Sequence, residues 1–256
     1  MISGKMSYGA VPEADAMGKN MQAPVAGEGW EADAKRGFLT KVYSILSVQL
    51  LFTVVCCAVC MYVEPVAGFM AHQGMPVFWF AFAGTIGSII GLYFYKTSHP
   101  TNLQLLAAFT LFESMLVGTI CAQYQAKGVE CAAEGLACAN LGHLIWIAWG
   151  ITFVIFASLT AFVVFSKIDF SFMGMFLFAG SIIMMGWALI SMLFGFQTTF
   201  LFGACGAALM SGYIIYDTHQ IMNRMGPDDY VIACVELYTD IITLFIYILD
   251  MLSARN

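Results

Sequence analysis

Residues 213–245 read YIIYDTHQIMNRMGPDDYVIACVELYTDIITLF. One apolar run ends near Met222 and a second begins at Tyr230, with Gly226 and Pro227 between them. Glycine is common just after the end of a helix, and proline is common in the first turn of the next. The stretch therefore predicts two antiparallel helices joined by a short turn.

The whole chain is as apolar as these two segments. It has 256 residues, of which 61% are hydrophobic and 10% are charged. Apolar runs of about 18 residues or more are typical of membrane-spanning helices. Seven such segments occur, at residues 42–63, 76–95, 103–124, 144–165, 170–194, 198–216 and 230–249. The sequence predicts an all-α polytopic membrane protein with seven transmembrane helices, whose main partner is the lipid bilayer.

The ends of the chain set its organisation and orientation. Residues 1–34 are polar and rich in Gly and Ala, which predicts a disordered tail before a transmembrane domain at 35–256.

Eight of the ten Lys and Arg residues fall on the side of the N-terminus, so that side is expected to be cytosolic. Seven crossings put the C-terminus on the opposite side, whereas a re-entrant seventh segment would return it to the cytosol. Basic residues spread this thinly argue against nucleic-acid binding.

The last two segments each carry one aspartate, Asp217 and Asp240. They lie ten and thirteen residues from Pro227, which corresponds to ~15 and ~20 Å along the two helices. They can therefore face each other at similar depth. A carboxylate inside a membrane is costly and marks a functional site, and two that share a site are expected to titrate as a unit. The alternative for Asp217 is a side chain that only caps or snorkels at the membrane rim.

Other polar residues extend this candidate site. Glu236 lies one helical turn before Asp240, so it either lines the same cavity or donates a hydrogen bond to a neighbouring helix. Thr243 and Tyr247 continue the same face. Two or three carboxylates give at most a transient calcium site, because calcium prefers six or more oxygen ligands. Calcium is thus expected as a permeant ion and no cofactor is predicted.

Three further side chains are candidate modulators. Glu113 lies within the third segment and either lines an ion pathway or hydrogen-bonds a neighbouring helix. Lys96 ends the second segment, either paired with an aspartate or solvated at the interface. His219 follows Asp217 by two residues and either adds proton sensitivity or is an interfacial residue without a sensing role.

The cysteines fall into two groups. Six are in or near apolar segments, where cysteine behaves as a small hydrophobic residue. Cys131 and Cys138 share the predicted non-cytosolic loop 125–142, where a structural disulfide is one of two equal possibilities.

Small residues recur four apart in the second segment, as Gly84/Ser88 and Gly87/Gly91, and in the sixth, around Gly203 and Gly206. Such spacing lets helices approach closely. It favours packing within one bundle, with a dimer interface as the alternative.

An enzymatic function is not predicted. The chain has no nucleophile elbow, phosphate-binding loop or dinucleotide fingerprint. Tyr216-Asp217 is shared with intramembrane aspartyl proteases, but Asp240 follows Leu237-Tyr238-Thr239 where those enzymes have glycines. Without glycine the backbone cannot approach a substrate as closely.

Several motifs in this order resemble the transmembrane Bax inhibitor motif family, closest to its lifeguard branch. They are YIIYDTHQI at 213–221, LYTDIITLF at 237–245, KIDFSFMG at 167–174, PTNL at 100–103 and FTLFES at 109–114. The similarity covers about residues 36–252.

The resemblance implies a bundle with the last helix central and surrounded by the other six. It also implies a pH-sensitive calcium leak of internal membranes, controlled by Asp217 and Asp240, that restrains cell death. An endomembrane, ER or Golgi, is then favoured over the plasma membrane as location. In bacterial relatives a basic residue near the end of the second helix pairs with one aspartate, and Lys96 is the nearest candidate here.

Two other functions fit the same sequence. The protein could be a regulatory membrane scaffold that binds partner membrane proteins of calcium or cell-death signalling without conducting ions. It could also be a proton-coupled transporter. Calcium flux through the pure protein distinguishes a leak channel from a scaffold.

Overall fold

The computed structural model describes residues 26–96, 98–134, 141–166, 168–194 and 199–254, and these form seven long helices. In chain order they are α1 (Ala26–Tyr62), α2 (Glu64–Tyr95), α3 (Thr101–Ala133), α4 (Leu141–Phe165), α5 (Met173–Phe194), α6 (Thr199–Asn223) and α7 (Tyr230–Ser253), with a short 3-10 helix, η2 (Pro227–Asp229), before α7. Each of the seven is long and apolar enough to cross a membrane. The predicted all-α polytopic fold is confirmed.

The first helix begins earlier than the sequence predicted. α1 begins at Ala26, so residues 26–34 of the predicted tail are part of this helix, while residues 1–25 lie outside the described chain. This stretch is rich in Ala and Glu, which have high helix propensity. Extending an existing helix also avoids the cost of nucleating a new one. α1 therefore continues beyond its apolar part on the side of the N-terminus.

Two predicted connections are also helical. α2 begins at Glu64, twelve residues before the predicted start at Pro76, and Gln73 is its one residue with non-helical backbone angles. That kink lies three residues before Pro76, whose ring clashes with the preceding turn. α3 continues to Ala133, so residues 125–133 of the predicted loop 125–142 are helical. Apolar runs in a sequence mark only the part of a helix that is apolar enough to lie in a membrane, and not its polar extensions.

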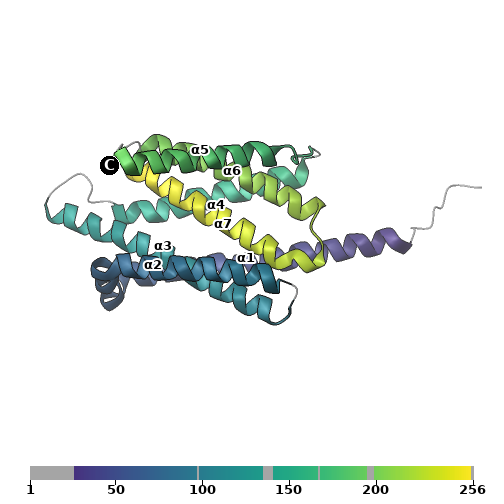
Figure 1. Cartoon of the computed structure of the whole chain (residues 1–256), viewed down its shortest axis with the longest axis horizontal. Coiled ribbons are helices and arrows are strands. Elements are labelled where there is room, and N and C mark those ends of the chain that lie inside the picture. The colour runs from purple at the N-terminus through teal and green to yellow at the C-terminus, as the bar shows by residue number, and fades with distance from the viewer. Residues whose placement is uncertain (1–25, 97, 135–140, 167, 195–198, 255–256) are drawn as a thin grey trace, which may run out of the picture.

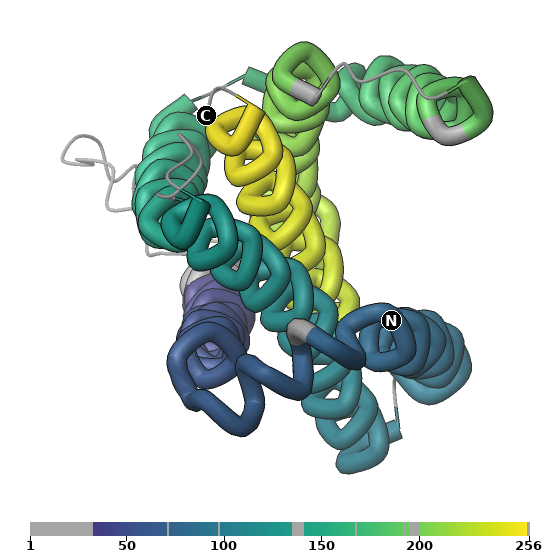
Figure 2. Tube along the Cα trace, turned by 90° about the vertical axis from the view of Figure 1, so that its left-hand side faces the viewer, coloured from purple at the N-terminus to yellow at the C-terminus, as the bar shows by residue number. Residues whose placement is uncertain are grey.

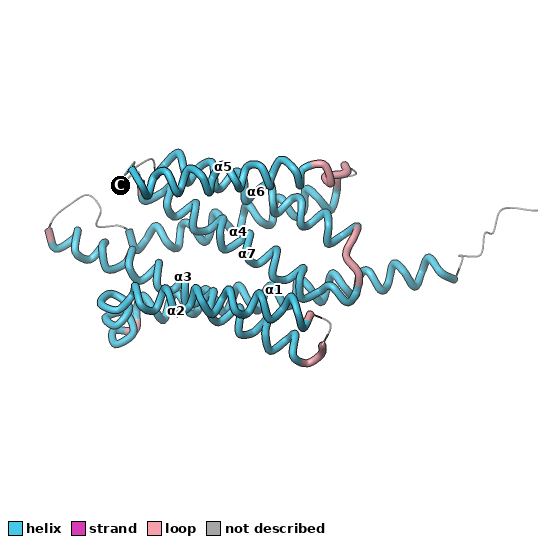
Figure 3. The backbone as a smooth tube through the Cα atoms, in the orientation of Figure 1, coloured by secondary structure: helices cyan, strands magenta, loops and turns pink. Residues whose placement is uncertain are grey.

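The helices alternate in direction along one axis. Figure 3 shows the α2–α3, α4–α5 and α6–α7 connections at the end of the bundle where α1 begins. Figure 1 shows the C-terminal end of α7 at the opposite end. α7 is a single unbroken helix of 24 residues. This geometry fits a spanning seventh helix and not a re-entrant one.

The last helix lies in the centre of the bundle (Figure 2). In the membrane-spanning part of α7, 61% of the residues are buried, against 56% in α3 and 11% in α5. α7 packs mainly against α1, α3, α4 and α6, while α2 and α5 lie on the outside. The expectation that all six other helices surround α7 is therefore corrected to four. Large apolar side chains such as Phe165 and Phe178 face outward, as expected in lipid.

Small residues bring helices together within the bundle, as predicted. A Cβ at Gly84 would overlap the Phe112 ring on α3. A Cβ at Gly203 would lie 2.9 Å from the backbone oxygen of Tyr247 on α7. Gly87, in contrast, has no neighbouring atom within 4 Å of such a Cβ. The α2–α3 and α6–α7 contacts thus depend on glycine at specific positions.

Candidate functional site

Asp217 and Asp240 meet between α6 and α7. The antiparallel register that sets Gly206 against Tyr247 also sets Asp217 against Asp240. The two residues are only 9% and 8% exposed, and their carboxyl groups lie close enough to interact with each other. A carboxylate has no hydrogen to donate, so a bond between two carboxyls requires that one of them be protonated. Two carboxyl groups placed next to each other in this way can share one proton.

The pair has few other partners. The buried Oδ2 atom of Asp240 has no hydrogen-bond partner among the described residues. An unpaired buried carboxylate oxygen is costly, because nothing replaces the water it has lost. A proton or a cation between the two carboxyls removes that cost.

Glu236 adds a third acid to this region. It is partly buried on α7 and close enough to both aspartates for their charges to interact. Across the described ranges, however, no three His, Cys, Asp or Glu side chains are arranged to hold a metal ion. The site therefore does not have the geometry of a resident metal centre.

The turn between the two helices is fixed by backbone hydrogen bonds. The amides of Arg224 and Met225 both donate to the Gln220 carbonyl, at 2.8 and 3.1 Å, and end α6. The Gly226 amide then donates to Asp229 Oδ2 at 3.2 Å. These bonds set where α7 begins and hence which residues of α7 face Asp217.

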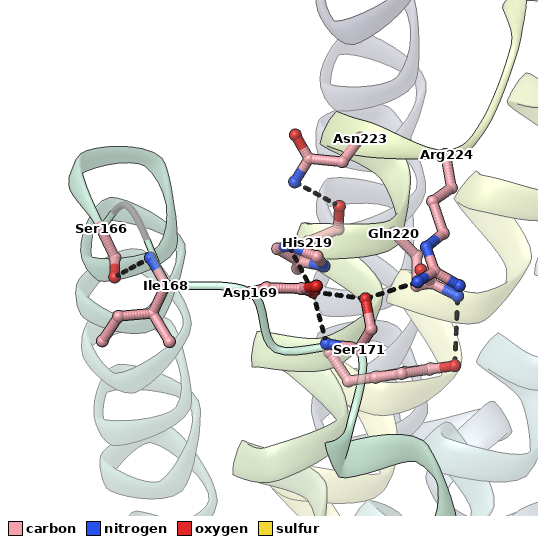
Figure 4. A network of polar contacts seen from close by, with 9 residues as sticks. Ser166, Ile168, Asp169, Ser171, His219, Gln220, Asn223 and Arg224 are labelled. Atoms are coloured by element: carbon pink, nitrogen blue, oxygen red, sulfur yellow. Dashed lines mark hydrogen bonds and ion pairs between the residues drawn. The ribbon is translucent and has the colours of Figure 1, made fainter.

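His219 lies in a polar network at the same end of the bundle (Figure 4). It is 8% exposed, and its Nε2 atom is 3.4 Å from Asp169 Oδ1 in the α4–α5 connection. Arg224 Nη2 donates to Ser171 Oγ at 2.7 Å. The network borders a cavity of about 380 Å³. His219 is thus a buried residue that ties the α4–α5 connection to α6.

Asp169 accepts two hydrogen bonds from one residue. The Ser171 hydroxyl and the Ser171 amide both donate to Asp169 Oδ1, the amide at 2.9 Å. These bonds, with smaller contributions from His219 and Arg224, hold the pKa of Asp169 below its ordinary value. Because the pKa of Asp169 is lowered, its carboxylate contact between the α4–α5 connection and α6 is complete above the ordinary pKa range of a carboxyl group. The contact is lost as the pH falls through the lowered pKa.

Replacing Ser171 with alanine is therefore expected to raise the Asp169 pKa towards its ordinary value. The contact between the α4–α5 connection and α6 would then be lost at a higher pH than in the wild type. Carbon-detected NMR titration of the Asp169 carboxyl in detergent micelles measures this directly. Ser166→Ala is the matched control, since Ser166 accepts a bond from the Ile168 amide and none from Asp169. An equal Asp169 pKa in the two variants would contradict the conclusion that the Ser171 hydroxyl lowers this pKa.

Glu113 and Lys96 lie away from the aspartate pair. The Thr85 hydroxyl donates to Glu113 Oε2 at 3.3 Å, so Glu113 bridges α3 to α2. Lys96 is exposed at the end of α2 and forms no ion pair within the described part of the chain. α2 packs on α3 and α1, outside the central helix. Lys96 therefore does not pair with an aspartate here, contrary to what the resemblance implied.

Cys131 is disulfide-bonded near the end of α3. Cys138, its predicted partner, lies outside the described residues, so this pairing stays a prediction. The six cysteines in or near apolar segments are free.

A buried hydrogen-bond network at the centre of the bundle was not predicted. Thr53 Oγ1 on α1 lies 2.8 Å from the Tyr238 hydroxyl on α7 and 3.0 Å from Ser114 Oγ on α3. Gln49 Nε2 donates to Thr110 Oγ1 at 2.7 Å one turn away. α1 and α3 each carry two of these polar residues four apart, which places them on one face of the helix. That spacing was the available signal, but it does not identify the partner helix.

Replacing Thr53 with valine is expected to destabilise the protein by roughly 1–3 kcal/mol, because the buried Tyr238 and Ser114 hydroxyls lose a shared partner. Thermal unfolding in detergent, followed by tryptophan fluorescence, measures the change. Thr152→Val is the matched control: Thr152 is equally buried, but within the described ranges its hydroxyl bonds to the Ala148 carbonyl of its own helix and to no other helix. Equal losses in the two variants would show that the network contributes nothing specific.

Seven potential spanning helices, of which the last is central, and a pair of neighbouring carboxyl groups between the last two define a polytopic all-α membrane protein. The chain belongs to the family described as inhibitor of apoptosis-promoting Bax1, which matches residues 35–256. The predicted family membership is thereby confirmed.

Curated relatives cover nearly the same part of the chain. Protein lifeguard 4 of Mus musculus is 38% identical over 223 residues, 87% of each chain. The Golgi anti-apoptotic protein of Vaccinia virus (strain Lister) is 35% identical over 224 residues, again 87% of each chain. Protein LIFEGUARD 4 of Arabidopsis thaliana is 33% identical over 227 residues, 86% of this chain and 85% of its own.

Proposed function

We propose that the protein is a pH-sensitive calcium leak channel of intracellular membranes that modulates cell death. The observation that carries this proposal is the buried contact between Asp217 and Asp240 on two adjacent helices. The cell-death role rests on the family and on the name of the Golgi anti-apoptotic relative, which also favours the Golgi as location. The ER is the alternative endomembrane.

The pair links protonation to helix packing. Two carboxylates about 4 Å apart repel each other by about 4 kcal/mol at an effective dielectric constant of 20, and a shared proton removes this repulsion. A change in protonation thus alters both the charge at the site and the contact between α6 and α7. Calcium passing between the helices meets carboxylate oxygens, the ligands it prefers. With too few ligands for tight binding, the ion is expected to pass through and not stay.

Flux through the pure protein tests the proposal. Liposomes loaded with calcium and containing only this protein are expected to lose calcium, at a rate that changes between about pH 5 and 8, where coupled carboxyls titrate. Protein-free liposomes and the Asp217→Asn variant are the controls, and the variant is expected to lose the pH response. Absence of flux at every pH would contradict the channel proposal and favour the scaffold, which acts through partner membrane proteins.

A further inference from the structure

The polar cavity beside His219 lies where spanning helices end. Its volume is about 380 Å³, and it is lined by the α4–α5 connection and by the last residues of α6. The spanning parts of α4 and α6 end at Phe165 and Asn223, so the cavity lies at the level of lipid headgroups. Polar pockets with a basic residue at the ends of transmembrane helices can bind such headgroups.

Arg224 gives this cavity a positive charge that is not neutralised. It is exposed and forms no ion pair within the described part of the chain. Of its five N–H donors, one is accepted by a described residue, at Ser171 Oγ. The other donors are available to a ligand. A guanidinium group binds a phosphate well, because it can donate two parallel hydrogen bonds to the phosphate oxygens.

Asp169 places a negative charge on the other side of Ser171 (Figure 4). Its contacts with the described residues, from Ser171 and His219, are all made by Oδ1. The Asp169 side chain is 75% exposed, which leaves Oδ2 able to accept from a ligand. The lowered pKa of Asp169 keeps this carboxylate charged at neutral pH. Its charge attracts an ammonium group.

A phosphate and an ammonium joined by a short spacer would satisfy both charges. Ser171 Oγ accepts from Arg224 and donates to Asp169, so a single hydroxyl separates the two charged side chains. In the headgroup of phosphatidylethanolamine an ethylene spacer separates the phosphate from the primary ammonium. A lipid with a phosphate alone would bring a negative charge towards Asp169, and the ammonium of phosphatidylcholine has no hydrogen to donate.

The rim of the cavity favours a lipid over a soluble ligand. Val164 and Ile168 line the cavity and are exposed, and Phe165 beside them is 85% exposed. These side chains are in a position to contact the acyl chains of a lipid whose headgroup lies in the cavity.

We propose that this cavity binds the headgroup of a lipid of the phosphatidylethanolamine type, with its phosphate at Arg224 and its primary ammonium at Asp169. The site is separate from the aspartate pair, and its occupancy does not depend on calcium conduction. A bound headgroup would join the α4–α5 connection to the end of α6.

Native mass spectrometry of the full-length protein in detergent tests the site. The protein is titrated with phosphatidylethanolamine, phosphatidylcholine and phosphatidic acid that carry the same acyl chains. Phosphatidylethanolamine is expected to bind about tenfold or more tightly than either of the others, because only its headgroup contacts both charged side chains with hydrogen bonds. Soluble glycerophosphoethanolamine is expected to compete poorly, because it lacks the acyl chains. These comparisons use the wild-type protein and need no variant to fold.

Two variants separate the two contacts. Arg224→Gln removes the charged phosphate donor and is expected to weaken phosphatidylethanolamine binding about tenfold or more. Asp169→Asn keeps the shape of the side chain but removes its charge, and is expected to reduce phosphatidylethanolamine binding to the level of phosphatidylcholine. Thermal unfolding confirms that each variant is folded.

The matched controls are Arg36→Gln and Asp228→Asn. Both residues are exposed at the same end of the bundle and do not line the cavity. Binding of phosphatidylethanolamine is expected to be unchanged in both control variants.

Three outcomes would overturn the proposal. The first is equal binding of phosphatidylethanolamine and phosphatidylcholine, or of phosphatidylethanolamine and phosphatidic acid, by the wild type. The second is binding in Arg224→Gln and Asp169→Asn that equals binding in their controls. The third is competition by glycerophosphoethanolamine as strong as that by the lipid, which would identify a soluble ligand in place of a lipid.

Discussion

Replacing Asp240 with asparagine is expected to remove the pH dependence of calcium leak. Asparagine has nearly the same shape as aspartate and keeps a hydrogen bond to Asp217, but it does not titrate and carries no charge. Where one proton controls the open state, the wild-type leak changes by up to about tenfold per pH unit. The variant is expected to give a flat profile over the same range.

Calcium efflux from liposomes at a series of pH values measures this effect. Asp250→Asn is the matched control, because Asp250 is a partly buried aspartate on the same helix whose contact is instead the Tyr124 hydroxyl, at 3.5 Å. It is expected to keep the wild-type profile. If Asp240→Asn retains the full pH response, the carboxyl pair is not the sensor.

Replacing Gly203 with valine is expected to separate α6 from α7. A Cβ at this position would lie 2.9 Å from the Tyr247 oxygen and 3.0 Å from the Met251 nitrogen, both backbone atoms of the central helix. Backbone atoms of a packed helix cannot move aside as a flexible side chain can. Overpacking of this kind typically costs about 1–3 kcal/mol, and a valine adds two further carbons to the clash. We expect a loss near or above the upper end of this range.

The midpoint of thermal unfolding in detergent measures this loss. Gly87→Val is the matched control, because Gly87 also lies within a spanning helix but has no atom within 4 Å of the position that a Cβ would occupy. Its unfolding midpoint is expected to change little. If both variants unfold alike, the close contact between α6 and α7 is not what Gly203 provides.

The sequence contained enough information for the number of helices and for the aspartate pair. Seven apolar segments of spanning length indicate a bilayer. Each segment is then a helix, because in a bilayer the polar backbone groups must bond within the segment. Asp217 and Asp240 flank a single short turn, so helix geometry alone predicts that they can meet. Their contact was therefore predictable from spacing without knowledge of the other helices.

Other features could not be predicted from one chain. The helical extensions at residues 26–34 and 125–133 are too polar to register as membrane segments, although helices continue readily into water. The partners of Thr53 on α3 and α7 are 61 and 185 residues away. Only the packed bundle brings them together. The same applies to His219 and Asp169, which meet because the α4–α5 connection folds against α6.

A double-mutant comparison tests the central claim most directly. Calcium efflux between about pH 5 and 8 is measured for the wild type, Asp217→Asn, Asp240→Asn and the double variant in the same liposomes. If the two carboxyls act as one unit, each single variant loses the pH response completely and the double variant loses nothing more. Independent, additive effects, or a pH profile that survives in the double variant, would contradict a leak controlled by the paired aspartates.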